Sequence, residues 1–148
     1  MNHLDIKLYG IDKDGIEKEF KLADFVGQKI IVYFYPKDNT SGCTQEACDF
    51  RDSYNRLISK AVVIGVSPDS IKSHRKFQEK HGLNFILLSD PEHKLAEAFG
   101  VWGEKSMYGK KYFGIIRSTF ILDKTGKIQQ EWVNVKVKGH VDEVLKSI

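Results

Sequence analysis

The two cysteines of this 148-residue chain, Cys43 and Cys48, are the residues whose spacing most narrowly limits its chemistry. Such a pair can belong to a metal site, a static disulfide, a thioredoxin-type redox motif, or a nucleophile with a partner thiol. A structural zinc site uses four Cys or His ligands, usually in close pairs. The histidines form no close pair, so we expect no metal site and place them at surface or helix-capping positions: His3, His74, His81, His93 and His140.

The spacing of the cysteines does not fit the thioredoxin-type motif, which is Cys-x-x-Cys, and it argues against a static disulfide. On one α-helix, five residues give a rise of about 7.5 Å and a rotation of about 140°, which separates the two α-carbons by roughly 8–9 Å. A disulfide needs α-carbons about 4.4–6.8 Å apart. Cys43 and Cys48 can therefore bond only if the first turn of such a helix unwinds, which is typical of a redox switch.

Cys43 is the better candidate for the reactive thiol. If a helix begins near Ser41, Cys43 lies in its first turn, close to free backbone N–H groups and the positive end of the helix dipole, and both favour the thiolate. Thr40 offers a hydroxyl that could hydrogen-bond the thiolate or a substrate oxygen, and Pro36 has no N–H that would compete for the site. A small buried cysteine at a helix start is the alternative. The residues around Cys43, together with the second thiol at Cys48, favour the chemical interpretation.

Apolar, β-rich runs predict the strands that position these residues. The run "KIIVYFYP" (29–36) is almost continuously apolar, as expected for a central strand covered on both faces. Turn-forming residues separate the other runs. Further strands are predicted at 61–68 and 84–90, a hairpin at 114–133 with its turn at Lys124–Gly126, and an N-terminal hairpin within 3–25 with "DKDG" at its turn.

Helices are predicted between and after these strands, from apolar residues at helical spacing and from terminal Pro and Gly signals. Alternating strands and helices followed by a hairpin indicate an α/β fold, with a central mixed sheet flanked by helices. The chain contains no linker, repeat or low-complexity tract, so we expect a single domain over 1–148. The predicted helices are 43–60, Asp69 or Ser70 to His81 before Gly82, 91–100 with Pro91 at an early helical position, and 140–148.

Composition narrows the class of protein. The hydrophobic fraction of 41% and the charged fraction of 29% are ordinary for a globular chain. A net charge of +3 with interspersed signs gives no basic block for nucleic acid. The first ten residues lack a secretory signal, and the apolar runs are too short to span a bilayer. We therefore expect a cytoplasmic protein without a membrane partner, in a compartment where a cysteine pair is more often catalytic, redox-sensing or metal-binding.

Two motifs identify the chain as similar to the peroxiredoxin family. Residues Pro36 to Cys43, "PKDNTSGC", fit the signature Pro-x-x-x-Thr-x-x-Cys without departure. The continuation "GCTQEAC" resembles the bacterioferritin comigratory protein (peroxiredoxin Q) subgroup, in which a resolving cysteine lies five residues after the peroxidatic one. Residues 106–123, "SMYGKKYFGIIRSTFILD", look like the second signature of that subgroup. The resemblance runs through most of the chain.

This resemblance implies a thioredoxin-like fold and thiol-dependent reduction of hydrogen peroxide and organic hydroperoxides. By position, Cys43 would be the peroxidatic cysteine and Cys48 the resolving one, and Pro36, Thr40 and Arg117 would complete the site. Cys43 would become a sulfenic acid, form an intramolecular disulfide with Cys48, and be restored by thioredoxin or a similar dithiol. No cofactor or metal would be required, and members of the subgroup are often monomers.

Several assignments stay open at this point. Glu46 either orients Arg117 or is an exposed helical glutamate. Aromatic residues near the site either form an apolar collar for organic peroxides or fill the core, and the core is favoured for each. The alternative functions are a non-peroxidatic thioredoxin-fold module and a binding or chaperone-like protein with incidental cysteines. The aromatic residues in question are Tyr33, Phe34, Tyr35 and Phe113, and packing is the simplest role for Trp102 and Trp132.

Overall fold

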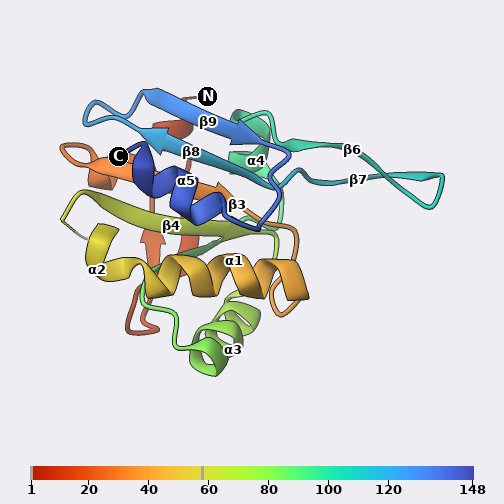
Figure 1. Cartoon of the computed structure of the whole chain (residues 1–148), viewed down its shortest axis with the longest axis horizontal. Coiled ribbons are helices and arrows are strands. Elements are labelled where there is room, and N and C mark those ends of the chain that lie inside the picture. The colour runs from red at the N-terminus through yellow and green to blue at the C-terminus, as the bar shows by residue number, and fades with distance from the viewer. Residues whose placement is uncertain (1, 58) are drawn as a thin grey trace.

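The largest element of the fold is a seven-stranded sheet, seen in a computed structural model that describes residues 2–57 and 59–148 (Figure 1). Three strands at its centre are parallel, and the outer strands are antiparallel to their neighbours. The predicted mixed sheet with an N-terminal hairpin is therefore confirmed. The strands are β1 (Leu8–Ile11), β2 (Glu17–Phe20), β3 (Lys29–Phe34), β4 (Ala61–Ser67), β5 (Ile86–Ser89), β8 (Ser118–Leu122) and β9 (Ile128–Val133), in the spatial order β2-β1-β5-β4-β3-β8-β9.

The central strand β3 carries apolar side chains on both faces because both faces of the sheet are covered. Ile30 and Val32 belong to one buried cluster, whereas Ile31 and Tyr33 belong to the other. Strand residues alternate between faces, so a strand buried on both sides must be apolar at nearly every position. This explains why the run at 29–36 could be recognised from the sequence.

Helices cover both faces of the sheet. α1 (Ser41–Asp52), α3 (Ile71–His81) and α5 (His140–Lys146) pack against the face that includes Tyr33, and α4 (Lys94–Ala98) packs against the opposite face (Figure 1). The predicted helix 43–60 is interrupted at Ser53, and a short α2 (Tyr54–Leu57) follows. Residue 58, which the prediction included, lies outside the described residues.

The ends of α3 follow local chemistry that the sequence predicts. The Ser70 hydroxyl accepts the N–H of Ser73 at the start of α3, and Gly82 ends the helix at a φ of 60°. A left-handed backbone at this position favours glycine because it carries no Cβ.

The start of α4 differs from its prediction. Pro91 lies in the turn before the helix and not inside it. The reason is the Asp90 carboxylate, which accepts the N–H groups of Leu95 and Ala96 and so caps a helix that begins later in the chain.

A second, two-stranded sheet projects from the body as an arm (Figure 1). It consists of β6 (Trp102–Met107) and β7 (Lys110–Ile115), paired antiparallel. The predicted hairpin at 114–133 was therefore wrong at its start, because residues 114 and 115 belong to β7 and the sheet strand begins at Ser118. No Gly or Pro lies between Ile115 and Ser118, so the sequence carries no strong turn signal at the boundary between these strands.

None of the helices in 2–57 and 59–148 combines the length and the apolar character needed to cross a bilayer.

Candidate active site

The first turn of α1 presents Cys43, as the sequence predicts. Thr40 occupies the N-cap position, and its carbonyl accepts the N–H of Thr44 at 2.8 Å. The Cys43 side chain is only 1% exposed and packs in the cluster between α1 and the sheet. A thiol held at a helix N-terminus lies beside the backbone N–H groups that stabilise negative charge. The local geometry therefore favours a thiolate at Cys43.

The Thr40 hydroxyl is turned away from the sulfur. It donates to the carbonyl oxygen of Lys37 at 2.9 Å and does not cap the helix. Of the two partners predicted for Thr40, the Cys43 sulfur or a substrate oxygen, the sulfur is not its partner in this structure. Because a hydroxyl carries one donor and rotates freely, the same group can donate to a bound oxygen once it leaves Lys37.

Arg117 reaches Cys43 from a distant part of the chain. Its Nη2 donates to Cys43 Sγ at 3.1 Å, across a separation of 74 residues. The sheet causes this contact, because β8 pairs antiparallel with β3 and places Ser118 opposite Phe34, next to the loop that leads into α1. The structure thus brings together the two residues that separate motifs had nominated.

Glu46 holds the other side of the Arg117 guanidinium. Arg117 Nη1 donates to Glu46 Oε1 at 2.7 Å, and the Glu46 side chain is fully buried. Burial raises the pKa of Glu46 to about 7, although the charge and hydrogen bond of Arg117 oppose the shift. Of the two interpretations that the sequence left open, orientation of Arg117 is the one the geometry supports.

The charges around Arg117 also act on the guanidinium itself. Burial lowers the pKa of Arg117, but the Glu46 carboxylate and the Cys43 thiolate outweigh it and raise that pKa above its ordinary value. Arg117 therefore stays charged, with one nitrogen committed to the carboxylate and another to the sulfur.

Gly42 allows the guanidinium to approach this closely. A Cβ atom at Gly42 would lie 3.3 Å from Arg117 Nη2, tighter than nearly all real contacts of that kind. Sequence reasoning missed this role, although Gly42 stands directly before Cys43 and could have been singled out as a point of close approach.

A cleft of about 560 Å³ opens over the site, between the loop after β3 and the base of the arm. Pro36 and Arg117, two of the predicted residues, lie in its wall. The cleft is lined by Pro36, Glu104, Lys105, Ser106, Ile116, Arg117, Val133, Asn134 and Val135.

Lys105 is a residue of this cleft that sequence reasoning missed. Its Nζ donates to the carbonyl oxygen of Ile115 at 2.8 Å. Burial and the neighbouring Arg117 lower the pKa of Lys105, and the Cys43 thiolate opposes them. No spacing signal could have found Lys105, because β6 was not predicted and the contact depends on the pairing of β6 with β7.

Cys48 lies on α1 with Cys43, and both cysteines are free thiols. Cys43 is buried and Cys48 is half-buried. The intact helix therefore keeps the thiols apart, as the spacing predicts. Their roles in a reaction remain a prediction at this stage.

The histidines are not all at surface or capping positions. His74 and His140 are buried, so that expectation was wrong for both. His74 is hydrogen-bonded to Asp38 and to a backbone carbonyl, and His140 is hydrogen-bonded to Thr119. Within the described part of the chain, no group of three or more His, Cys, Asp or Glu residues is arranged to hold a metal ion.

The aromatic residues near the site mostly fill the core. Tyr33, Phe34 and Tyr35 are completely buried, whereas Phe113 is 65% exposed on the arm. The core interpretation therefore applies to the three strand residues. Trp102 stacks on His93 with ring centroids 3.5 Å apart, in agreement with a packing role.

The chain is similar to proteins of one family. The sequence profile of the AhpC/TSA family matches residues 4–131. "Peroxiredoxin Bcp" of Bacillus subtilis is 59% identical over 129 residues, which are 86% of this chain and 82% of that protein. "Putative peroxiredoxin bcp" of Coxiella burnetii is 52% identical over 126 residues, 84% of this chain and 83% of that protein.

Solved structures give the same similarity. The bacterioferritin comigratory protein of Xanthomonas campestris has a TM-score of 0.89 and 41% identity, over 98% of this chain and 90% of that one. A cysteine-to-serine mutant of Xanthomonas campestris peroxiredoxin Q has a TM-score of 0.91 with the same identity and coverage. The likeness therefore extends over almost the whole fold, including the arm and the loop before α1.

Proposed function

Because the chain belongs to the AhpC/TSA family and is a thiol-dependent peroxidase of the bacterioferritin comigratory protein (peroxiredoxin Q) type with a thioredoxin-like fold, we propose that Cys43 is its peroxidatic residue. One observation carries this proposal: the 3.1 Å contact, at a helix start, between Cys43 Sγ and Nη2 of Arg117, a residue that also lines the cleft. Cys48 has no such cation on its sulfur among the hydrogen bonds described.

In the first step, the Cys43 thiolate attacks the terminal oxygen of the hydroperoxide. The O–O bond breaks, the sulfur is oxidised to sulfenic acid, and the departing alkoxide takes a proton to leave as an alcohol or water. Arg117 stabilises the thiolate and the negative charge that develops on the oxygens. A preorganised donor of this kind is worth roughly 100- to 1,000-fold in rate.

Thr40 and Pro36 complete the substrate site. The Thr40 hydroxyl would exchange the carbonyl of Lys37 for a peroxide oxygen, at the cost of one hydrogen bond and the gain of another. Pro36 lines the cleft with a ring that has no N–H, so it excludes water without offering a competing donor.

In the second step, Cys48 resolves the sulfenic acid. The first turn of α1 unwinds, which breaks the bond from Thr44 N–H to the Thr40 carbonyl. The Cys48 thiol then displaces water from the sulfenic acid and forms a disulfide with Cys43. Because this step needs local unfolding, changes that stabilise the helix between the cysteines should slow it and favour overoxidation.

An external dithiol, thioredoxin or a similar protein, reduces the disulfide by thiol–disulfide exchange. Hydrogen peroxide and organic hydroperoxides are the proposed substrates, and the alkyl peroxide reduction described for the Xanthomonas campestris relative supports the second class. We propose that the enzyme is a monomer and that it acts in the cytoplasm. The reducing environment of the cytoplasm keeps both thiols reduced.

The test is mass spectrometry of the intact protein after one equivalent of peroxide, combined with thioredoxin-coupled turnover. The parent should lose two hydrogen atoms, mapped to Cys43 and Cys48 in one disulfide. Cys43→Ser should abolish peroxide consumption, and Cys48→Ser should react once and stop as sulfenic acid at Cys43. An unchanged parent mass, or full turnover by Cys43→Ser, would overturn the proposal.

A further inference from the structure

A buried polar cluster lies beneath the loop that carries Pro36 and Thr40, and its centre is Asp38. The Asp38 side chain is 1% exposed, yet three donors converge on it. Tyr35 Oη donates to Oδ1 at 2.6 Å, Ser73 Oγ donates to Oδ2 at 2.8 Å, and His74 Nδ1 lies 2.8 Å from Oδ2. Every oxygen of this carboxylate is therefore hydrogen-bonded.

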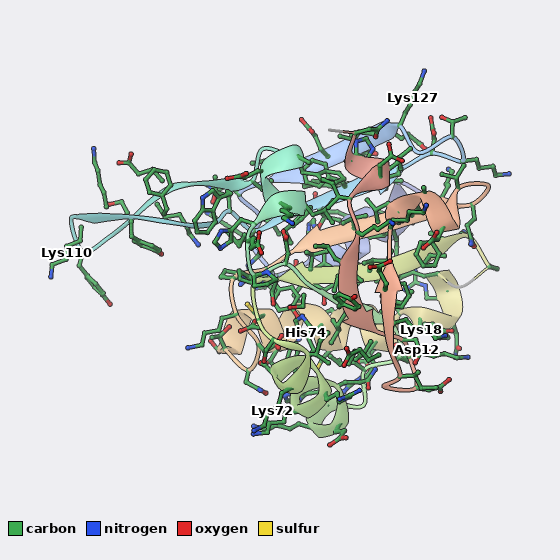
Figure 2. The ribbon with its side chains drawn as sticks, turned by 180° about the vertical axis from the view of Figure 1, so that it is seen from behind. Asp12, Lys18, Lys72, His74, Lys110 and Lys127 are labelled. Carbon is green, nitrogen blue, oxygen red and sulfur yellow. The ribbon has the colours of Figure 1, made fainter. Side chains whose placement is uncertain are left out.

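His74 ties the cluster to strand β5. Its Nε2 lies 2.9 Å from the carbonyl oxygen of Leu88 at the end of β5. A carbonyl can only accept, so Nε2 carries a hydrogen, and Nδ1 faces a carboxylate on the other side of the ring. Both ring nitrogens of His74 and both carboxylate oxygens of Asp38 therefore have hydrogen-bond partners. Figure 2 shows His74 on the side of α3 that faces the body of the molecule.

The backbone of Asp38 is held as well as its side chain. Its N–H donates to Asp69 Oδ2 at 2.8 Å, and Ser67 Oγ donates to the same oxygen at 2.7 Å. The midpoint of the loop is thus bound to the segment that joins β4 to α3. Two residues before it stands Pro36, and two residues after it stands Thr40.

The next residue marks a conformational boundary. Asn39 has a φ of 60°, in the left-handed region that non-glycine residues rarely adopt. It stands between the anchored Asp38 and Thr40, the N-cap of the helix whose first turn must open. Asparagine tolerates this conformation better than most residues with a Cβ, so Asn39 turns the chain between the anchored Asp38 and the start of α1.

We propose that Asp38 and His74 are positioning residues of the peroxide site, which keep the Pro36–Thr40 loop in place against α3 and β5 while the first turn of α1 unwinds. They act through the loop, whereas Arg117 and Glu46 act on the sulfur directly. The inference rests on the proposed function, because the position of the loop matters only if peroxide reacts at Cys43.

The main test compares two reactions of Cys43 in His74→Gln. The rate constant with hydrogen peroxide should fall about 10- to 100-fold, because small displacements of a site loop cost that much. Alkylation of Cys43 by iodoacetamide in a Cys48→Ser background should change less than twofold, since Arg117 and Glu46 still stabilise the thiolate. A merely structural role for His74 would lower both rates together.

Gln78→Met is the matched control on the same helix. Gln78 Nε2 donates to the carbonyl oxygen of Asp12 at 2.8 Å, so this side chain ties α3 to the β1–β2 turn and not to the site loop. The variant loses a partly buried hydrogen bond of α3 and should keep the parent rate with peroxide. Urea unfolding of both variants shows whether their losses of stability are comparable.

Ser73→Ala and Tyr35→Phe extend the test if His74→Gln does not fold. Each removes a single donor to the Asp38 carboxylate and leaves the His74 contact intact. We expect about a two- to fivefold loss of the peroxide rate in each, roughly the worth of one hydrogen bond.

Several results would overturn the inference while leaving the proposed function standing. One is a folded His74→Gln that reacts with peroxide at the parent rate. Others are equal losses in Gln78→Met, parallel losses in alkylation and peroxide reaction, or, where His74→Gln does not fold, parent rates in both single-donor variants. If instead the parent fails to consume peroxide, or Cys43→Ser still does so, the proposed function has failed first.

Discussion

Two hydrogen-bonded side-chain pairs, His74–Asp38 and Arg117–Glu46, hold the loop before α1 and the start of that helix, and they are built differently. His74 and Asp38 are both almost completely buried, and both oxygens of the carboxylate and both nitrogens of the ring are hydrogen-bonded. Arg117 and Glu46 are joined at 2.7 Å, but Arg117 reaches into the cleft. Within residues 2–57 and 59–148, the second carboxylate oxygen of Glu46 has no hydrogen-bond partner.

The difference in hydrogen bonding suggests different roles: the His74–Asp38 pair fixes the position of the loop, and the Arg117–Glu46 pair takes part in the chemistry. A fully satisfied buried network favours one arrangement, because any displacement leaves a polar atom unpaired. A pair with an unpaired oxygen costs stability, and proteins keep such pairs where function needs them. We therefore expect the His74–Asp38 pair to contribute more to stability, and the Arg117–Glu46 pair to contribute more to rate.

The largest expected effect is on rate, at Arg117. Arg117→Met should lower the rate constant for oxidation of Cys43 by hydrogen peroxide about 100- to 1,000-fold, since it removes the donor to the sulfur. Arg117→Lys should recover only part of this, because an ammonium cannot serve the sulfur and Glu46 with one planar fork. Stopped-flow oxidation measures both variants. A loss below tenfold in Arg117→Met would contradict the expectation that this pair contributes mainly to the rate.

The second effect is on stability, at the other pair. Asp38→Asn should lower the free energy of unfolding by about 3–5 kcal/mol, because it leaves His74 buried without its partner. Glu46→Gln should cost far less at pH 8, since it replaces a carboxylate that already lacks one partner. Urea unfolding at constant m-value gives both numbers. Equal losses in the two variants would contradict the comparison.

The pH dependence of stability sharpens the same contrast. Burial raises the pKa of Glu46 to about 7 from an ordinary value of 4.5, with Arg117 opposing the shift. Between these pH values the folded chain holds a proton that the unfolded chain releases, so the contribution of Glu46 is fully present below pH 4.5 and is lost as pH rises through 7.

The parent should therefore lose about 3 kcal/mol relative to Glu46→Gln as the pH rises across this window. Urea unfolding of the two proteins at a series of pH values measures the difference between them. A difference that does not change with pH would show that Glu46 titrates at its ordinary value when folded.

The smallest expected effect is at Lys105, which lies in the cleft without touching either pair. Lys105→Met should slow the reaction of Cys43 with peroxide by about two- to fivefold at low salt, because a nearby charge that solvent still screens contributes only a fraction of 1 kcal/mol. Lys105→Arg should restore the rate, and added salt should reduce the difference between parent and Lys105→Met. A salt-independent loss would point to packing of the arm instead of charge.

Much of the fold could be predicted from the sequence, because local patterns specify it. The run at 29–36 is apolar at nearly every position, which only a strand buried on both faces requires. Ser70 and Gly82 mark the ends of α3 by hydrogen-bonding and backbone properties that do not depend on the rest of the chain. The start of α4 was missed because Pro91 was taken as a helix signal, although the nearby Asp90 carboxylate caps a helix that begins three residues after Pro91. The boundary between β7 and β8 was missed because it depends on strand pairing.

The candidate site divides in the same way. The separation of Cys43 and Cys48 on one helix follows from their spacing alone, and motif positions nominated Pro36, Thr40 and Arg117 as their neighbours. The sequence by itself therefore determined which residue types meet and why the two thiols cannot bond in an intact helix.

Only the tertiary structure decided how those neighbours are held. The pairing of β8 with β3 brings Arg117 to Cys43 across 74 residues. Burial of the Glu46 side chain raises the pKa of its carboxyl group to about 7. Tertiary packing also buries His74 beside Asp38. Nothing in the sequence of the loop around Asp38 predicts this contact. Contacts and burial of this kind depend on where distant segments meet, which spacing along a single chain does not encode.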